Sequence, residues 1–198
     1  MSLLPTPPPE YEHEKSNFLV ASPYTDLAHL LDLATLSPPC QLIATALTAM
    51  QAVTDSYATT AYEDAFNWAD VVARLAQLAE AGGYTYPETS FYVIVFRSRV
   101  PHSTSRAYLG DLDAETHREA VASGGLLKYW FGTPDKDGRN LATCLWRNRS
   151  DAKRGGAGKG HAQAMLEVRG LYLEWRVERL RFIVGEGAKS WRIVQWED

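Results

Sequence analysis

Cysteine is scarce in this chain of 198 residues, which has only Cys40 and Cys144. Both lie among apolar residues, and two isolated cysteines fit buried free thiols better than a disulfide framework or a zinc site with closely spaced ligands. Long apolar runs are also missing, because no stretch approaches the roughly 18 apolar residues of a membrane span. The opening MSLLPTPPPEYEHEK lacks the basic and apolar regions of a signal peptide. The sequence therefore predicts a cytoplasmic protein with no metal and no membrane partner.

Basic side chains are rare in the first half of the chain. Residues 1–96 hold two basic and eleven acidic side chains, a net charge of −9, whereas residues 97–198 hold eighteen basic and thirteen acidic ones, a net charge of +5. The arginines of the second half alternate with acidic residues, and the whole chain is acidic. Charge complementarity between the two halves explains this better than a nucleic-acid surface. We expect no nucleic-acid partner.

Motifs for nucleophilic catalysis and for nicotinamide, flavin or metal binding are absent from the sequence. The run GGAGKG at 155–160 fails as a phosphate-binding loop, since Lys153 stands where the pattern needs glycine and Gly160 where it needs Ser or Thr. The run is better interpreted as a flexible break between two helical pieces, which could serve as a mobile lid. We therefore expect no cofactor. If the protein is an enzyme, we expect its reaction to depend on the shape of a pocket and on a few proton donors.

The first 84 residues are predicted to be an arm followed by a helical extension. Residues 1–23 are rich in proline and have little apolar periodicity, which is typical of an extended arm. Residues 24–84 show the apolar spacing of three helices. These helices are expected at 27–34, ended by Pro38 and Pro39; at 42–53; and from a cap at Thr60 to Gly82 and Gly83. His29 lies off the apolar stripe of the first helix and is predicted to be a solvated surface residue.

Residues 85–198 are predicted to form a separate ferredoxin-like domain. Strands are expected at 90–100, 126–132, 140–147, 173–184 and about 190–197, with helices at 111–123 and, interrupted by the glycine-rich run, from about 150 to 172. The order is βαββαββ. A βαββαβ unit places both helices on one face of an antiparallel sheet. The predicted fold class is therefore α+β, a ferredoxin-like βαββαβ(β) domain of the dimeric α+β barrel type with an N-terminal helical extension.

The predicted strands carry apolar residues on both faces. In the first, Tyr92, Ile94 and Phe96 alternate with Phe91, Val93 and Val95, so both sides of the sheet need cover. A homodimer with sheets face to face would supply that cover, unless the N-terminal helices do so within one chain. We favour the homodimer.

Two histidines are predicted to face a pocket between the sheet and the helices. His161 leads an apolar helical stripe that includes Met165, and His117 shares the inner face of the preceding helix with Ala120. Imidazole is the side chain best suited to proton transfer near neutrality, so these two residues and Tyr129 are the predicted catalytic groups. The alternative is that each histidine satisfies a hydrogen bond in or near the core.

Aromatic side chains are concentrated on the predicted strands, and the chain has six tryptophans. Most must be core, but their broad surfaces also suit a pocket for a flat or polycyclic ligand. Arg179 could hold a carboxylate or oxyanion, or could instead pair with a nearby glutamate. The predicted substrate-binding residues are Tyr92, Phe96, Trp130, Trp146, Trp175, Arg179 and Met165.

The runs HREAVASGGLLKYWFG, RNLATCLWR and GKGHAQAM resemble the core of the dimeric α+β barrel superfamily, which includes small antibiotic-biosynthesis monooxygenases and polyketide cyclases. More narrowly, residues 57–198 resemble an uncharacterised family of fungal proteins. The resemblance implies a pocket between sheet and helices, onto which His117 and His161 map, but no single reaction. The N-terminal helices depart from the small members of the superfamily.

The function expected from the sequence is that of a cofactor-independent cyclase of fungal secondary metabolism. It would fold an apolar polyene, polyketide or terpenoid substrate inside an aromatic pocket and promote a cyclisation, for example a cycloaddition of Diels–Alder type. The alternatives are a cofactor-free monooxygenase acting on a phenol, or a non-catalytic protein that binds a small molecule. A haem protein ranks fourth, with His117 or His161 as the axial ligand.

Overall fold

The computed structural model describes residues 17–197, apart from the side chains of residues 168 and 169. The predicted arm therefore lies outside the described residues as far as residue 16. The strands are β1 (Phe18–Leu19), β2 (Leu31–Asp32), β3 (Thr89–Arg99), β4 (Leu126–Phe131), β5 (Arg139–Trp146), β6 (Glu174–Val184) and β7 (Trp191–Gln195). The α-helices are α2 (Pro38–Ala46), α3 (Tyr62–Ala65), α4 (Trp68–Ala81), α5 (Arg106–Ser123), α6 (Arg149–Gly155) and α7 (Lys159–Leu171). Short 3-10 turns are η1 (Leu27–His29), η2 (Leu33–Thr35), η3 (Leu47–Ala49) and η4 (Glu186–Ala188).

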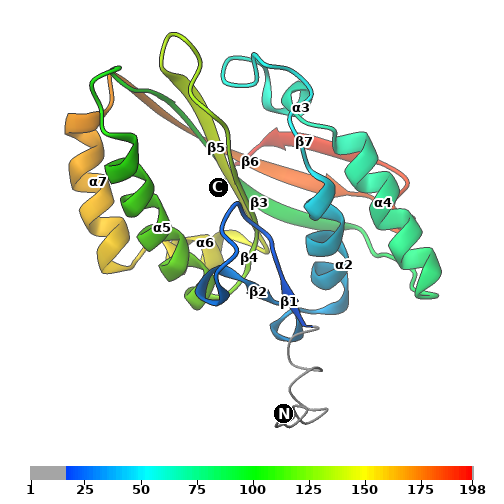
Figure 1. Cartoon of the computed structure of the whole chain (residues 1–198). Helices are drawn as coiled ribbons and strands as arrows, with labels where there is room; N and C mark the ends of the chain where they lie inside the picture. Colours follow the sequence, from blue (N-terminus) through cyan, green and yellow to red (C-terminus); the bar gives the residue numbers. More distant parts are fainter. Residues whose placement is uncertain (1–16, 198) are drawn as a thin grey trace, which may run out of the picture.

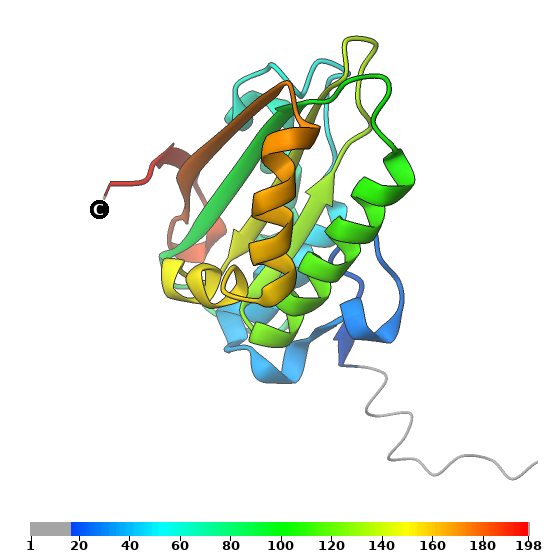
Figure 2. The ribbon, with the colours of Figure 1, turned by 90° about the vertical axis from the view of Figure 1, so that its left-hand side faces the viewer.

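The main sheet has five antiparallel strands in the order β4-β5-β3-β6-β7. Its first four strands in the chain, with α5 and the α6–α7 pair as crossovers, form a ferredoxin-like βαββαβ unit, and β7 extends the edge beside β6. Both crossovers return to the same face, so α5 and α7 lie side by side in front of the sheet in Figure 2. The predicted α+β ferredoxin-like fold and the order βαββαββ are confirmed.

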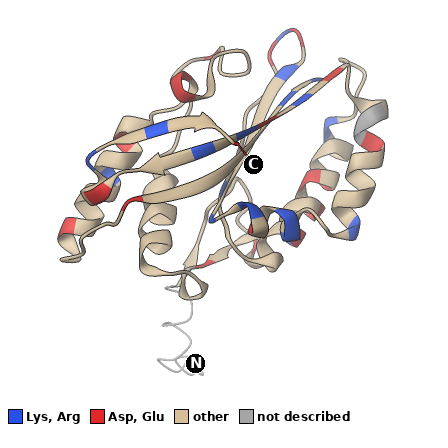
Figure 3. Cartoon of the chain, turned by 180° about the vertical axis from the view of Figure 1, so that it is seen from behind, with Lys and Arg blue, Asp and Glu red and all other residues tan. Residues whose placement is uncertain are grey.

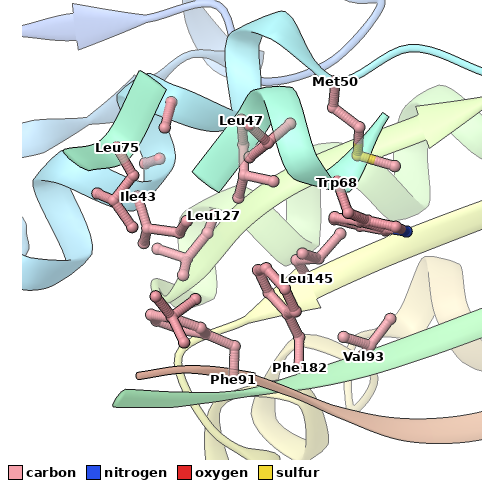
Figure 4. Packing of buried hydrophobic residues seen from close by; sticks show 14 of the residues in the cluster. Ile43, Leu47, Met50, Trp68, Leu75, Phe91, Val93, Leu127, Leu145 and Phe182 are labelled. Carbon is pink, nitrogen blue, oxygen red and sulfur yellow. The ribbon is translucent and has the colours of Figure 1, made fainter. Parts of the chain in front are cut away.

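The opposite face of the sheet packs against the chain's own N-terminal helices. Figure 1 shows α2 and α4 on the side of the sheet away from α5 and α7. Ile43 of α2 and Trp68 and Leu75 of α4 are fully buried against Phe91 and Phe182 of the sheet (Figure 4). A bare face was the reason for predicting a homodimer through that side. That reason is wrong, because α2 and α4 already remove the apolar surface from water.

The segment 27–34 does not form the predicted helix. It contains η1, the short strand β2 and η2, and β2 pairs with β1. Two local features account for the difference. Asp32 has extended backbone and its side chain accepts a hydrogen bond from the Ala34 N–H, which starts the next turn. Pro38 and Pro39 occupy the first turn of α2, where their missing N–H groups cost nothing, so they begin a helix instead of ending one.

The remaining helix boundaries also differ from expectation. In place of the helix predicted at 42–53, α2 begins at Pro38 and ends at Ala46, and η3 follows it to Ala49. The helix predicted from Thr60 divides into α3 and α4, because Phe66 adopts extended backbone between them. It ends at Gly82, as predicted. Helix α5 begins five residues earlier than expected, since Ser105 accepts a hydrogen bond from the Tyr108 N–H as its N-cap. Within residues 17–197, no helix is both long enough and apolar enough to cross a membrane.

Candidate functional site

A largely apolar pocket of about 460 Å³ lies between the α5–α7 layer and the sheet. Its floor is the side of β3, β4 and β5 on which even residues of β3 and β5 point, such as Phe96, Ala142 and Cys144. Helices α5 and α7 form its roof. The loops after β3 and β4 form one end, and Trp146 and Leu126 lie at the other. A pocket of this size suits a small molecule of two or three fused rings.

Asp113 of α5 is the acidic group around which the polar side of this pocket is organised. Its carboxylate accepts hydrogen bonds from the hydroxyls of Tyr24, at 2.5 Å, and Tyr129. Burial raises the pKa of Asp113, and the two phenol donors oppose that rise. The pKa values of both tyrosines are raised, chiefly by their own burial and further by the neighbouring carboxylate. The two phenols therefore remain proton donors at neutral pH.

His117 lies one helical turn beyond Asp113, lines the same pocket and is 5% exposed. Its Nδ1 is 2.8 Å from Nδ1 of His29 in the N-terminal segment. Burial and, to a smaller extent, the nearby His29 imidazole together lower the pKa of His117 to about 4. His117 is thus a neutral imidazole at physiological pH. The ring of Tyr24 stacks on His29, with a centroid distance of 4.7 Å, and contacts the His117 ring at a tilt, with a centroid distance of 5.1 Å.

The residues around Asp113 and His117 come from three separate parts of the chain: α5, β4 and the N-terminal segment. The inner face of α5 presents Asp113 and His117 at i and i+4. Strand β4 presents Tyr129 because it pairs with Cys144 on the pocket side of β5. The N-terminal segment is held at the free edge of β4 by a hydrogen bond from the Tyr129 N–H to the Ala21 carbonyl, at 2.9 Å. That contact carries Tyr24 and His29 over the end of the pocket.

His161 lies near the N-terminus of α7 and lines the pocket, 28% exposed at its side chain. It also has a protein partner. Glu119 of α5 accepts hydrogen bonds from the backbone N–H groups of Gly160 and His161, and its carboxylate is 3.3 Å from His161 Nδ1. Those backbone hydrogen bonds are the main cause of the lowered pKa of Glu119. The carboxylate thus caps α7 and orients the imidazole.

Seven of the residues predicted for the site line this pocket, and three do not. The pocket contains His161, His117, Tyr129, Phe96, Trp146, Trp175 and Met165. Trp130 points to the opposite face, where its ring meets Phe66 edge-on at 4.9 Å, because it pairs with Thr143 on that side of β5. Tyr92 is buried edge-on against Trp196, at 4.8 Å. Arg179 is exposed on β6 outside the lining residues. The structure therefore places these three apart from the pocket.

Sequence reasoning missed Asp113, Tyr24 and His29. The i, i+4 relation between Asp113 and His117 was a usable signal that the two side chains share a helix face. His29 is only partly exposed and contacts His117, so the expectation of a solvated histidine is wrong. That expectation assumed a helix over 27–34. Nothing in the local pattern indicates that Tyr24 reaches a carboxylate 89 residues away.

Two pocket residues have a buried polar atom with no hydrogen-bond partner among the described residues. They are Trp146, through its indole Nε1, and Asn140, through Oδ1. A bound molecule with an acceptor and a donor group would satisfy them. Within residues 17–197, no cluster of three or more His, Cys, Asp or Glu side chains is arranged to hold a metal ion.

A second hollow, of about 760 Å³, opens on the other side of the sheet beside β6 and β7. Figure 3 shows Lys and Arg positions on these two strands. Ion pairs link most of the charged side chains at this hollow. Arg97 binds Glu178 at 2.7 Å and donates to the carbonyls of Tyr57, Ala58 and Thr60, while Arg139 binds Glu174 at 2.7 Å. These contacts fasten the loop at 57–60 to the sheet.

The fold and the pocket define a ferredoxin-like α+β protein with a largely apolar cavity between its sheet and its crossover helices. Comparison with known proteins identifies the family. A model of the PB2B2.08-like family matches residues 20–195. The UPF0643 protein PB2B2.08 of Schizosaccharomyces pombe is 37% identical over 183 residues, which cover 89% of this chain and 83% of that protein. The chain therefore belongs to the PB2B2.08-like family.

Solved structures also resemble part of the chain. Rv0793 from Mycobacterium tuberculosis is 15% identical with a TM-score of 0.41, over 46% of this chain and 92% of that one. SnoaB from Streptomyces nogalater, described as a cofactor-independent oxygenase, is 17% identical with a TM-score of 0.39, over 46% of this chain and 91% of that one.

Proposed function

We propose that this protein is a cofactor-independent cyclase that closes a ring in a small, mostly apolar polyketide- or terpenoid-type molecule by proton transfer. The observation that carries the proposal is the position of a neutral, buried imidazole, His117, beside the Asp113 carboxylate at the wall of an apolar pocket. Pairs of titratable groups with separated pKa values are typical of acid–base sites.

The proposed reaction begins at the carbon between two carbonyl groups of the substrate. The free ring nitrogen of His117 accepts a proton from that carbon, and the resulting enolate attacks a third carbonyl of the same molecule to form the ring bond. His117 then returns the proton to the new alkoxide. The Asp113 carboxylate stabilises the imidazolium that exists between these two steps, and the hydrogen bonds from its two phenol partners favour its ionised form. No net oxidation occurs.

Base-assisted ring closure accounts for the cluster better than a cycloaddition does. A cycloaddition of Diels–Alder type needs orientation by the pocket and a hydrogen-bond donor, for which the Trp146 indole would suffice. It would leave the neutral imidazole and the buried carboxylate unused. Burying these groups costs stability, so a reaction that uses both is the better explanation.

A second candidate is a cofactor-free monooxygenase acting on a phenol. The same neutral imidazole would deprotonate a phenol inside the apolar pocket, and the phenolate would then react with molecular oxygen. Oxygen distinguishes the two functions. Product formation that persists under argon supports the cyclase, whereas formation that stops and resumes with air supports the monooxygenase.

The proposal is tested first by proton exchange, which needs no knowledge of the natural substrate. Bicyclic 1,3-diketones in deuterated buffer, with and without the protein, are followed by NMR for loss of the acidic carbon-bound proton. Exchange should be accelerated by the wild type and reduced 100-fold or more by Asp113→Asn or His117→Gln. Glu115→Gln is the control, because Glu115 lies on α5 but pairs with Arg118 at the surface. No acceleration by the wild type, or equal loss in the control, would contradict the proposal.

A further inference from the structure

The contact between His29 and His117 connects the pocket to solvent. His117 is 5% exposed and lines the pocket, whereas His29 is partly exposed and is not one of the lining residues. Their Nδ1 atoms are 2.8 Å apart. At this distance one nitrogen carries a hydrogen and the other accepts it, so a single proton lies between the two rings. The second nitrogen of each ring, Nε2, then lies at the outer end of the pair, on the side away from the other ring.

We infer that His29 and His117 form a two-imidazole relay that carries protons between the closed end of the pocket and solvent. This inference rests on the proposed proton-transfer function. A proton taken from the substrate binds Nε2 of His117, while the hydrogen on Nδ1 of His117 passes to Nδ1 of His29. The hydrogen on Nε2 of His29 then leaves to water. Each ring ends neutral in its other tautomer, which discharges the His117 imidazolium. The reverse sequence brings a proton back through His29 and His117 to the new alkoxide and resets the pair.

The surroundings hold the pair in this arrangement. The Tyr24 ring contacts both imidazoles, and its hydroxyl donates a hydrogen bond to Asp113. The backbone N–H of His29 donates to the Asp26 carbonyl at 2.8 Å, which fixes the turn that carries it. Both contacts come from the N-terminal segment, outside the ferredoxin-like unit. That segment is therefore a positioning element of the site.

The other titratable groups around the pair do not replace His29 as the exit. Asp113 of α5 is engaged by the hydroxyls of Tyr24 and of Tyr129 on β4. Cys144 of β5 is half-buried, and burial raises the pKa of its thiol. His161 of α7 faces Asp113 from across the pocket and pairs with Glu119. Asp113 interacts electrostatically with His29. His29 is the titratable group that directly contacts His117 through nitrogen.

Nuclear magnetic resonance on the full chain, with histidine labelled by nitrogen-15, tests the pair without any substrate. The expected result is a through-hydrogen-bond coupling between the two Nδ1 atoms near pH 7, with the rings in complementary tautomers. In His29→Ala, the coupling should vanish and His117 should titrate at a higher pH, since His29 lowers its pKa. Two rings that titrate independently in the wild type, without coupling, would overturn the relay.

The diketone exchange assay tests the transport step. In weakly buffered solution His29→Ala should slow exchange at least tenfold, and added imidazole should restore the rate in proportion to its concentration. Leu27→Ala, at a 69% exposed position of the same turn, should keep the wild-type rate. A His29→Ala rate equal to wild type would overturn the relay while leaving the cyclase standing. Absence of exchange in the wild type would count against the cyclase, and the NMR coupling would still decide whether the pair exists.

Discussion

The hydroxyl of Tyr24 donates a hydrogen bond at 2.5 Å to the carboxylate of Asp113, which lies 89 residues further along the chain. The contact joins the N-terminal segment to α5, and it is the reason that the end of the pocket is closed by residues outside the ferredoxin-like unit. It also places an aromatic ring over both imidazoles of the His29–His117 pair.

Removing the Tyr24 hydroxyl should therefore change the pKa of the Asp113 carboxyl group. In Tyr24→Phe, Asp113 retains only Tyr129 as a phenol donor, so its pKa should rise further above the ordinary value. A carbon-13 titration of the Asp113 carboxyl measures this. We expect a destabilisation of about 1 kcal/mol, typical of one lost hydrogen bond. An unchanged carboxyl titration would show that Tyr24 does not bind Asp113 in solution.

The lowered pKa of His117 predicts how stability depends on pH. Between about pH 6.5 and 4 the unfolded chain protonates this imidazole and the folded protein does not, so stability is lost as the pH falls through that range. The loss attributable to His117 should be about 3 kcal/mol. The raised pKa of Asp113 acts in the opposite direction, but it is common to the wild type and His117→Gln.

Urea unfolding at pH 7.5 and pH 4 tests this directly. The wild type should lose about 3 kcal/mol more than His117→Gln on acidification. Parallel losses in the two proteins would mean that His117 is not held neutral by the fold.

The ferredoxin-like unit could be predicted from the second half of the sequence, because each of its strands and helices is recognisable from the apolar spacing of its own residues. Leu126 to Phe131 and Arg139 to Trp146 begin and end within one residue of expectation. The structure of the N-terminal segment could not be predicted in the same way. Its leucines lie in short turns, and the segment is held in place by its contact with the edge strand β4. His117 was found because it shares a helix face with apolar residues. Tyr24 and His29 were not, because only the tertiary contact with α5 brings them to the pocket.

Trp68 is expected to make unfolding cooperative across the whole chain. It is 1% exposed on α4, meets Phe182 of β6 at 5.0 Å and donates from its indole to the Tyr62 carbonyl at 3.2 Å. Trp68→Ala should cost about 3 to 5 kcal/mol, in one transition seen by both circular dichroism and tryptophan fluorescence. Leu166→Ala, at a position 75% exposed, should cost far less. Two separate transitions in the wild type would show that the N-terminal helices and the sheet unfold independently.

Gly155, the last residue of α6, and Gly156, its C-cap, allow a matched pair of substitutions. A Cβ at Gly155 would overlap the six-membered ring of Trp146, whereas one at Gly156 would make only an ordinary contact of 3.5 Å with the Ala152 carbonyl. Gly155→Ala should therefore destabilise the protein by about 1 to 3 kcal/mol and displace a wall of the pocket. Gly156→Ala should be near neutral. Equal melting temperatures for the two variants would contradict the packing of Trp146 on α6.

Whether small apolar molecules bind in the pocket is tested by filling it with a larger side chain. Ala142 lies in mid-strand on the pocket floor and pairs in register with Phe96 of β3 and Phe131 of β4, so a phenyl group there would project into the cavity. Ala142→Phe should bind the apolar dye anilinonaphthalene sulfonate at least tenfold more weakly than the wild type, because the volume that would hold the dye is occupied. Ala81→Phe, at an exposed position near the end of α4, makes the same change away from the pocket and should bind like the wild type. If Ala142→Phe and Ala81→Phe bind the dye equally well, the cavity between α5, α7 and the sheet is not where small apolar molecules bind.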